Sequence, residues 1–358
     1  MTETKTPPRR MRRLVGAALG AGLVIGAAVG VPLGHSVSQG GGVLEAVSTV
    51  NGTHDAATRN DTDFNERFSH EFVDVDDVNM HYVVGGDGPP LVLIHGWPQT
   101  WYAWKEIMPE LAEHRTVYAI DLPGFGDSSG TPEAFDKKTL SGYVHELLEV
   151  ELDGEQADIV AHDLGAGVGF QYASRYPDDV RSYVHLDYPL PSSDVLPAET
   201  YRTFSWHMSF NSRPRIPEKL VDDRGDVREY LQEFYAQVAH DGAAFGGEST
   251  EAPFSDAEID EYTRTYSRPE VLRAGFELYR SLDQDERDND AADPVAAPTM
   301  LLTAEGSLAG TQPTLESLVT DLRKAEEVPD SGHWLAEESP EAVSAEIIDF
   351  IRSPVTHR

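Results

Sequence analysis

The strongest candidate for chemistry is a carboxylate at the junction between a predicted strand and a predicted helix. Asp163 follows the apolar run 157–161 and precedes the small residues of 164–167. A residue in such a turn is held in a strained conformation that exposes its side chain, and small neighbours are needed where the backbone approaches itself. Backbone N–H groups at the start of the helix would keep the carboxylate ionised. An ordinary helix N-cap would also be Asp, so the assignment of a nucleophile depends on other residues.

A carboxylate nucleophile restricts the reaction. Attack on a carbonyl would give a labile anhydride, whereas attack on saturated carbon gives a stable alkyl ester. The substrate would therefore carry a leaving group on sp³ carbon, as an epoxide or a C–halogen bond does. Hydrolysis of the ester then needs a base for water and donors for the developing oxyanion.

Four short motifs follow one another along the chain: His-Gly-Trp-Pro at 95–98, Asp-Leu-Pro-Gly-Phe-Gly at 121–126, the Asp163 turn, and Ser-Gly-His-Trp at 331–334. In this order they resemble the α/β-hydrolase family, and within it the epoxide hydrolases. The resemblance extends over about residues 70–352. It implies hydrolysis of epoxides to vicinal diols without a cofactor.

The resemblance implies a role for each motif. Asp163 would be the nucleophile and His333 the base that activates water. The backbone N–H groups of Trp97 and Leu164 would form an oxyanion hole, in which the loss of one donor typically costs about 2.7–4 kcal/mol of barrier.

Two acids could orient His333. Asp187 ends the predicted strand 182–186, and Glu305 follows the predicted strand 299–303. Some epoxide hydrolases place the acid at the position of Asp187, and the segment after Glu305 lacks the Asp that is usual there. We therefore favour Asp187, with Glu305 as the alternative.

The segments 205–210 and 276–280 resemble those that carry a His and a Tyr in secreted bacterial epoxide hydrolases. His207 and Tyr279 would then hydrogen-bond the epoxide oxygen as the ring opens. Both could instead be ordinary packing residues. The alternative tyrosines of this region are Tyr188, Tyr201, Tyr262 and Tyr266.

Two other functions are compatible with the same nucleophile. Haloalkane dehalogenases typically carry Trp directly after it, and fluoroacetate-type enzymes carry Arg there and again three positions later. This sequence has Leu164 and Gly167 at those places, so a dehalogenase is the second candidate. An inactive binding protein is the third, although such relatives usually lack the nucleophile or the base.

Two other kinds of functional motif, a serine nucleophile and a metal site, are not predicted. Residues 126–130 fit G-x-S-x-G, but they follow a Pro-Gly pair and no helix of small residues comes next, so Ser128 is not predicted to be a nucleophile. The 13 His form no H-E-x-x-H pattern, and no metal site is predicted.

Alternating strands and helices predict a mostly parallel, doubly wound sheet. A core of 64–187 and 297–352 would be interrupted by a helical cap at 188–296, and the site would lie at the carboxyl ends of the strands. We expect strands at 71–75, 78–84, 91–94, 117–120, 157–161, 182–186, 299–303 and 327–328, and helices at 100–112, 140–152, 164–175, 314–324 and 340–351.

Composition excludes several classes of function. The 358 residues include 62 acidic and 28 basic ones and carry a net charge of −34, which opposes binding to nucleic acid. With no cysteine, disulfides and thiolate chemistry are impossible. An acidic surface poor in lysine is typical of proteins that fold in molar salt, so we expect a halophilic enzyme.

The N-terminal region resembles an export signal. The uncharged, apolar stretch 14–33 follows four arginines, and it is long enough for a cleaved signal or a membrane anchor. We expect a signal or anchor at 1–34 and a polar linker at 35–63, which place the enzyme outside the cell or on its outer face. Asn51 and Asn60 begin possible glycosylation sequons, and the sequence gives no indication of oligomeric state.

Overall fold

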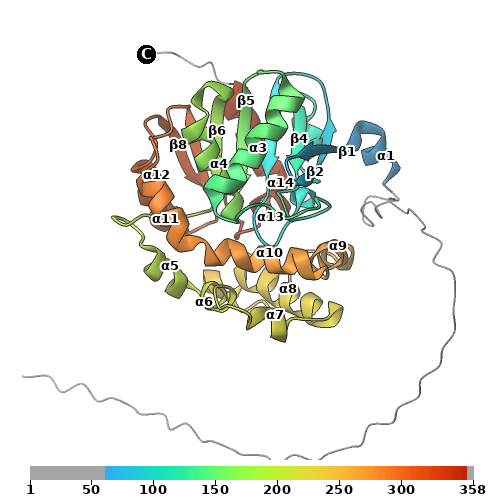
Figure 1. The fold of residues 1–358 in the computed structure, drawn as a ribbon, viewed down its shortest axis with the longest axis vertical. Helices are drawn as coiled ribbons and strands as arrows, with labels where there is room; N and C mark the ends of the chain where they lie inside the picture. Colours follow the sequence, from blue (N-terminus) through green and yellow to red (C-terminus); the bar gives the residue numbers. More distant parts are fainter. Residues whose placement is uncertain (1–60, 353–358) are drawn as a thin grey trace, which may run out of the picture. The chain divides into compact units, whose positions relative to one another are not determined.

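Eight strands form one sheet in the part of the chain that this computed structural model describes, residues 61–352 (Figure 1). Their order is β1-β2-β4-β3-β5-β6-β7-β8. The pairs β1–β2 and β2–β4 are antiparallel, and all other neighbours are parallel. The strands are β1 (Phe68–Val75), β2 (Val78–Gly85), β3 (Pro90–Ile94), β4 (Thr116–Ile120), β5 (Ala157–His162), β6 (Val180–Leu186), β7 (Thr299–Thr303) and β8 (Leu322–Glu327).

Both faces of the central strands are covered. Every residue of β3, β5 and β7 is buried, as expected for continuous apolar runs in a parallel sheet with helices on each side. On one face of the sheet α3 packs against α4 (Figure 1). Helix α2 packs against α14. The predicted α/β-hydrolase fold with a mostly parallel sheet is confirmed. The helical segments of this layer are α1 (Thr62–Arg67), η1 (Trp101–Trp104), α2 (Met108–Leu111), α3 (Lys137–Leu152), α4 (Leu164–Arg175), η2 (Pro177–Asp179), α12 (Leu308–Glu316), α13 (Leu335–Glu338) and α14 (Pro340–Arg352).

A second group of helices lies between β6 and β7, in the segment expected to form the cap. These helices lie together beyond the ends of the strands (Figure 1). Contacts such as those of Trp97 with Phe234 and Tyr279 show that they cover the carboxyl ends. They are α5 (Ala198–Phe204), α6 (Trp206–Asn211), α7 (Pro217–Leu220), α8 (Arg224–Val238), η3 (Ala243–Phe245), α9 (Asp256–Tyr266), α10 (Pro269–Arg280) and α11 (Leu282–Asp290).

Two predicted helices are wrong in extent. The helix expected at 100–112 is divided into η1 and α2, because Pro109 at the start of α2 lacks an N–H and disfavours helical geometry in the residue before it. The helix expected at 314–324 ends at Glu316, and Leu322 already belongs to β8. This edge strand is rich in charged residues, which protect an exposed edge but give no strand pattern.

The N-terminal predictions lie largely outside the described residues. The apolar stretch 14–33 and both sequons are among the residues that are not described. Helix α1 begins at Thr62, capped by the Asp61 side chain, so the end of the expected linker is helical. Between residues 61 and 352, none of the helices has the length and apolar character needed to cross a bilayer.

Candidate active site

Asp163 lies in the sharp turn between β5 and α4. Its φ of 50° is in the left-handed region, which is costly for a residue with a side chain and is typical of functional turns. The turn also brings α4 close to the loop after β3. A Cβ on Gly165 would lie 2.1 Å from the carbonyl oxygen of His95, so only glycine fits there.

The Asp163 carboxylate is held by donors on two sides. The backbone N–H of Trp97 donates to Oδ2 at 2.9 Å, and Nε2 of His333 lies 3.6 Å from Oδ1. Burial alone would raise the pKa of Asp163, but the hydrogen bond and charge of His333, helped by the N–H of Leu164, hold it below its usual value. Asp163 is therefore an ionised, buried and oriented nucleophile candidate. The two N–H groups that the sequence analysis named for an oxyanion hole both face it.

Of the two acids considered for orienting His333, Asp187 is the one in contact with it. Nδ1 of His333 donates to Oδ2 of Asp187 at 2.7 Å, and the N–H of Ala304 donates to the other oxygen at 3.1 Å. Glu305 is exposed and accepts from the N–H of Asp330 instead. The strand ends of β5 and β6 thus place Asp163 and Asp187 on opposite nitrogens of one imidazole.

The two carboxylates change the titration of His333. Burial lowers the pKa of this imidazole, but the hydrogen bonds and charges of Asp163 and Asp187 outweigh it and raise the pKa to about 10. With Asp163 ionised, His333 is therefore an imidazolium. Loss of the Asp163 charge would remove one of the two groups that stabilise that proton.

His207 and Tyr279 face the nucleophile from the cap. Their rings meet edge to face at 5.8 Å, and the Tyr279 ring contacts Trp97 at 5.2 Å. Ser205 Oγ lies 2.8 Å from Nδ1 of His207 and fixes the ring. Burial lowers the pKa of His207 to about 4, and burial and the charge of Asp163 raise the pKa of Tyr279. Both side chains are therefore neutral donors close to Asp163.

The alternative tyrosines divide into two pairs. Tyr262 and Tyr266 donate their hydroxyls to Glu337 and to the carbonyl of Gln99, at 2.5 and 2.9 Å, and are already committed. The rings of Tyr188 and Tyr201 pack at 5.9 Å, and in both the charge of Asp163 adds to the effect of burial in raising the pKa. Tyr188 and Tyr201 therefore belong to the surroundings of the nucleophile.

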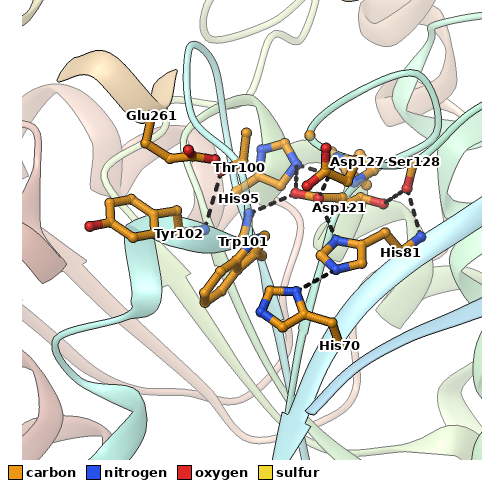
Figure 2. Close-up of polar contacts among 12 residues, drawn as sticks. His70, His81, His95, Thr100, Trp101, Tyr102, Asp121, Asp127, Ser128 and Glu261 are labelled. Atoms are coloured by element: carbon orange, nitrogen blue, oxygen red, sulfur yellow. Dashed lines mark hydrogen bonds and ion pairs between the residues drawn. The ribbon is translucent and has the colours of Figure 1, made fainter. Parts of the chain in front are cut away.

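Ser128 has a structural role (Figure 2). Its hydroxyl donates to the carbonyl of Asp121 at 2.8 Å and accepts from the N–H of His81 at 2.9 Å. The Asp121 carboxylate in turn accepts from Nδ1 of His81 at 2.7 Å and from the N–H of Trp101 at 2.8 Å. This buried network fixes the loops after β3 and β4, and it already uses the Ser128 hydroxyl as both a donor and an acceptor.

The sequence analysis did not identify three polar residues that contact the backbone of His333 directly or through one another. His162, Gln99 and Glu337 are hydrogen-bonded in series and end on the backbone carbonyl of His333. The one available signal was the position of His162, directly before Asp163.

Two groups of metal-ligating side chains occur among residues 61–352, and neither includes Asp163 or His333. In each, three ligand atoms lie within 4.8 Å of one another, and exposed acidic clusters of this kind are common without an ion. The groups are His145 with Glu149 and Asp179, and His240 with Glu305 and Asp330.

Comparison with known proteins assigns the chain to a family. A family model described as the alpha/beta hydrolase fold matches residues 89–340, and the chain belongs to this family. It is 29% identical over 287 residues to the soluble epoxide hydrolase of Corynebacterium sp. (strain C12), covering 79% of this chain and 96% of that protein. It is 30% identical over 256 residues to a fluoroacetate dehalogenase of Burkholderia sp, covering 68% and 80% of the two chains.

Solved structures give the same class. Wild-type Cfl2 from Burkholderia cenocepacia is similar with a TM-score of 0.70 and 33% identity, over 80% of this chain and 96% of that one. The Cif epoxide hydrolase from Acinetobacter nosocomialis gives 0.69 and 26%, over 80% and 89%. The protein is therefore a hydrolase whose relatives include epoxide hydrolases and a dehalogenase.

Proposed function

We propose that this protein hydrolyses epoxides to vicinal diols through a covalent alkyl ester on Asp163. The observation that carries the proposal is the placement of one ionised carboxylate between the Trp97 N–H, the His333 imidazole and the neutral donors His207 and Tyr279. Such a site provides a nucleophile, a base and a place for a leaving oxygen.

Ring opening is the first step. Oδ1 of Asp163 attacks an epoxide carbon, the C–O bond breaks, and its electron pair remains on the oxygen. His207 and Tyr279 stabilise that oxygen through hydrogen bonds, and one of them supplies its proton. Oδ2, already held by the Trp97 N–H, becomes the carbonyl oxygen of the ester. The carbonyl oxygen of the ester therefore already lies in the oxyanion hole before the second step.

Hydrolysis of the ester is the second step. Alkylation removes the charge of Asp163, so the pKa of His333 falls from the raised value it has beside two carboxylates. The proton that His333 releases replaces, through solvent, the one that His207 or Tyr279 gave to the ring oxygen. The neutral imidazole then takes a proton from water, which attacks the carboxyl carbon. The N–H groups of Trp97 and Leu164 stabilise the tetrahedral oxyanion. Its collapse releases the diol, with a proton from His333.

Dehalogenation is the second candidate, favoured by the 30% identity to a fluoroacetate dehalogenase. The same Asp163 would displace a halide, and the ester would be hydrolysed in the same way. Leu164 and Gly167 offer no side-chain donor for a halide or for a substrate carboxylate, whereas His207 and Tyr279 suit an epoxide oxygen. We therefore place epoxide hydrolysis first.

A paired assay separates the two candidates. Purified enzyme is given small terminal epoxides and, separately, haloalkanes and haloacetates, and diol and halide are both quantified. We expect diol formation that is abolished in Asp163→Asn. Halide release without epoxide turnover would reverse the ranking, and turnover of neither class would favour a binding protein.

A further inference from the structure

A chain of polar side chains connects the cap to the backbone of the catalytic histidine. His162, the last residue of β5, is 4% exposed. Its Nε2 lies 2.8 Å from the carbonyl oxygen of His333, and its Nδ1 lies 3.0 Å from Oε1 of Gln99. Nε2 of Gln99 faces one carboxyl oxygen of Glu337. The hydroxyl of Tyr262, from α9, donates to the other at 2.5 Å.

These contacts allow two arrangements of hydrogen atoms. With the amide oriented as described, both nitrogens of His162 face oxygen acceptors, so the ring must be an imidazolium and Glu337 a carboxylate. Rotation of the Gln99 amide by half a turn exchanges its oxygen and nitrogen at nearly the same places. The Glu337 hydroxyl then donates to Gln99, the amide N–H donates to Nδ1 of His162, and Nε2–H donates to His333. Both arrangements contain the same number of protons.

The surroundings of His162 oppose a charge on that ring. Its centroid lies 4.7 Å from that of His333, whose positive charge Asp163 and Asp187 already stabilise. Burial and the charge of His333 lower the pKa of His162 to about 4, although the charges of Asp163 and Asp187 oppose this shift. Two adjacent imidazolium rings are therefore avoided if His162 is neutral.

The surroundings of Glu337 oppose a carboxylate. Burial raises the pKa of this carboxyl group well above its ordinary value, and the charges of Glu258 on α9 and Glu338 on α13 raise it further. The hydrogen bonds from Tyr262 and Gln99 lower it by less than these effects raise it.

We propose that Glu337 is a neutral carboxylic acid in the resting enzyme and that, through the amide of Gln99, it holds His162 as a neutral imidazole that positions the backbone of His333. All three act through His333 and are positioning residues. The inference rests on the proposed role of His333 as the base. A neutral His162 does not oppose the proton that His333 takes from water, whereas an imidazolium 4.7 Å away would.

Infrared difference spectroscopy tests the protonation directly. At neutral pH, the spectrum of the wild type minus that of Glu337→Gln should show the C=O band of a protonated carboxyl group. Glu338→Gln is the matched control, because the Glu338 carboxylate accepts hydrogen bonds from the N–H groups of Trp334 and His240. This variant should lose only carboxylate bands. If the difference spectrum for Glu337→Gln shows only the loss of carboxylate bands, the inference is overturned.

Kinetics test the positioning role. Glu337→Gln should keep kcat within a few-fold and leave its pH profile in place, because an amide N–H can replace the acid O–H as donor to Gln99. Glu337→Leu has no donor and should lower kcat by about 10²-fold through misplacement of His333. A shifted pH profile in Glu337→Gln would show that a charge had been removed, and would contradict the inference.

The infrared measurement needs no substrate and no turnover. If the protonated band is missing while diol is formed, the inference fails and the proposed function stands. If the band is present and neither substrate class is turned over, the proposed function fails and with it the role of Glu337 in catalysis. The outcomes are therefore distinguishable even where Glu337→Leu does not fold.

Discussion

The His333 imidazolium lies between two carboxylates, with one ring nitrogen facing Asp187 and the other facing Asp163. The imidazole donates to Asp187 at 2.7 Å and lies 3.6 Å from Asp163. Because the pKa of His333 is about 10, its ring is charged in the resting site and forms an ion pair with a carboxylate on each side. In the proposed mechanism, alkylation of Asp163 causes His333 to release a proton, so formation of the ester would itself activate the base for the second step.

This arrangement predicts a pH-dependent contribution of His333 to stability. A group with a folded pKa raised from 6.5 to about 10 stabilises the fold fully below pH 6.5, and its contribution is lost as pH rises through about 10. The difference in unfolding free energy between the wild type and His333→Gln should therefore be largest at mildly acidic pH and decrease toward pH 10. Chemical unfolding at a series of pH values measures it, and a difference that grows with pH would refute the assignment.

The sequence singles out Asp163 and His333 as candidates because each follows a local pattern, and their roles as nucleophile and base stay predictions. Asp163 lies between a largely apolar strand and a helix that begins with small residues, and His333 follows a glycine near the last helix. The series of hydrogen bonds that joins Glu337, Gln99 and His162 to the backbone of His333 could not be predicted in this way. Its partners are 63, 171 and 238 positions apart, and no local pattern specifies that Gln99, His162 and Glu337 meet.

Helix α10 brings Tyr279 over the nucleophile by packing very closely on Trp97. A Cβ on Gly275, one turn before Tyr279, would lie 2.2 Å from Nε1 of Trp97. Glycine inside a helix is unfavourable by about 1 kcal/mol relative to alanine, and here the close approach explains it. The position of Tyr279, the proposed donor to the ring oxygen, therefore depends on the absence of a side chain at residue 275.

Gly275→Ala should push α10 away from Trp97 and displace Tyr279. We expect kcat to fall by about 10–10²-fold and stability to fall by about 1–3 kcal/mol. Gly310→Ala in α12 is the matched control: nothing lies within 4 Å of its Cβ, so it should raise stability by about 1 kcal/mol at unchanged kcat. Equal kcat in both variants would show that the packing does not position Tyr279.

A buried ion pair joins the core to the cap on the other side of α10. Nζ of Lys137, at the start of α3, donates to Asp285 on α11 and to the carbonyl of Leu278, both at 2.7 Å. Burial raises the pKa of Asp285 to about 6 in spite of Lys137. The pair fixes the backbone next to Tyr279, and neither residue is more than 2% exposed.

Lys137→Met should destabilise the protein by about 3–5 kcal/mol, because it leaves the charge of the buried Asp285 uncompensated, with the backbone N–H of residue 137 still donating to Oδ1. The double variant Lys137→Met with Asp285→Leu should recover much of that loss, since both charges are then removed. Urea unfolding followed by circular dichroism measures the three proteins. If Lys137→Met is as stable as the wild type, the ion pair does not stabilise the packing of the cap on the core.

At the scale of the whole molecule, the net charge of −34 is the dominant feature. Self-repulsion among carboxylates destabilises a folded protein, and salt screens it, with a Debye length of about 10 Å at 0.1 M and about 3 Å at 1 M. We therefore propose that this enzyme is adapted to high salt.

The melting temperature should rise as KCl increases from the sub-molar to the molar range. Sorbitol at matched water activity is the control, since it does not screen charge. A melting temperature that is flat or falls with KCl would refute the adaptation to salt, while leaving the site unaffected.

The most direct test of the account follows the oxygen atoms of Asp163. The enzyme turns over epoxide in water enriched in heavy oxygen, and the peptide that contains residue 163 is then weighed. We predict that solvent oxygen enters the Asp163 side chain, because water attacks the carboxyl carbon and an original carboxyl oxygen leaves in the diol. Label found only in the diol after a single turnover, with none in the peptide, would contradict a covalent ester on Asp163.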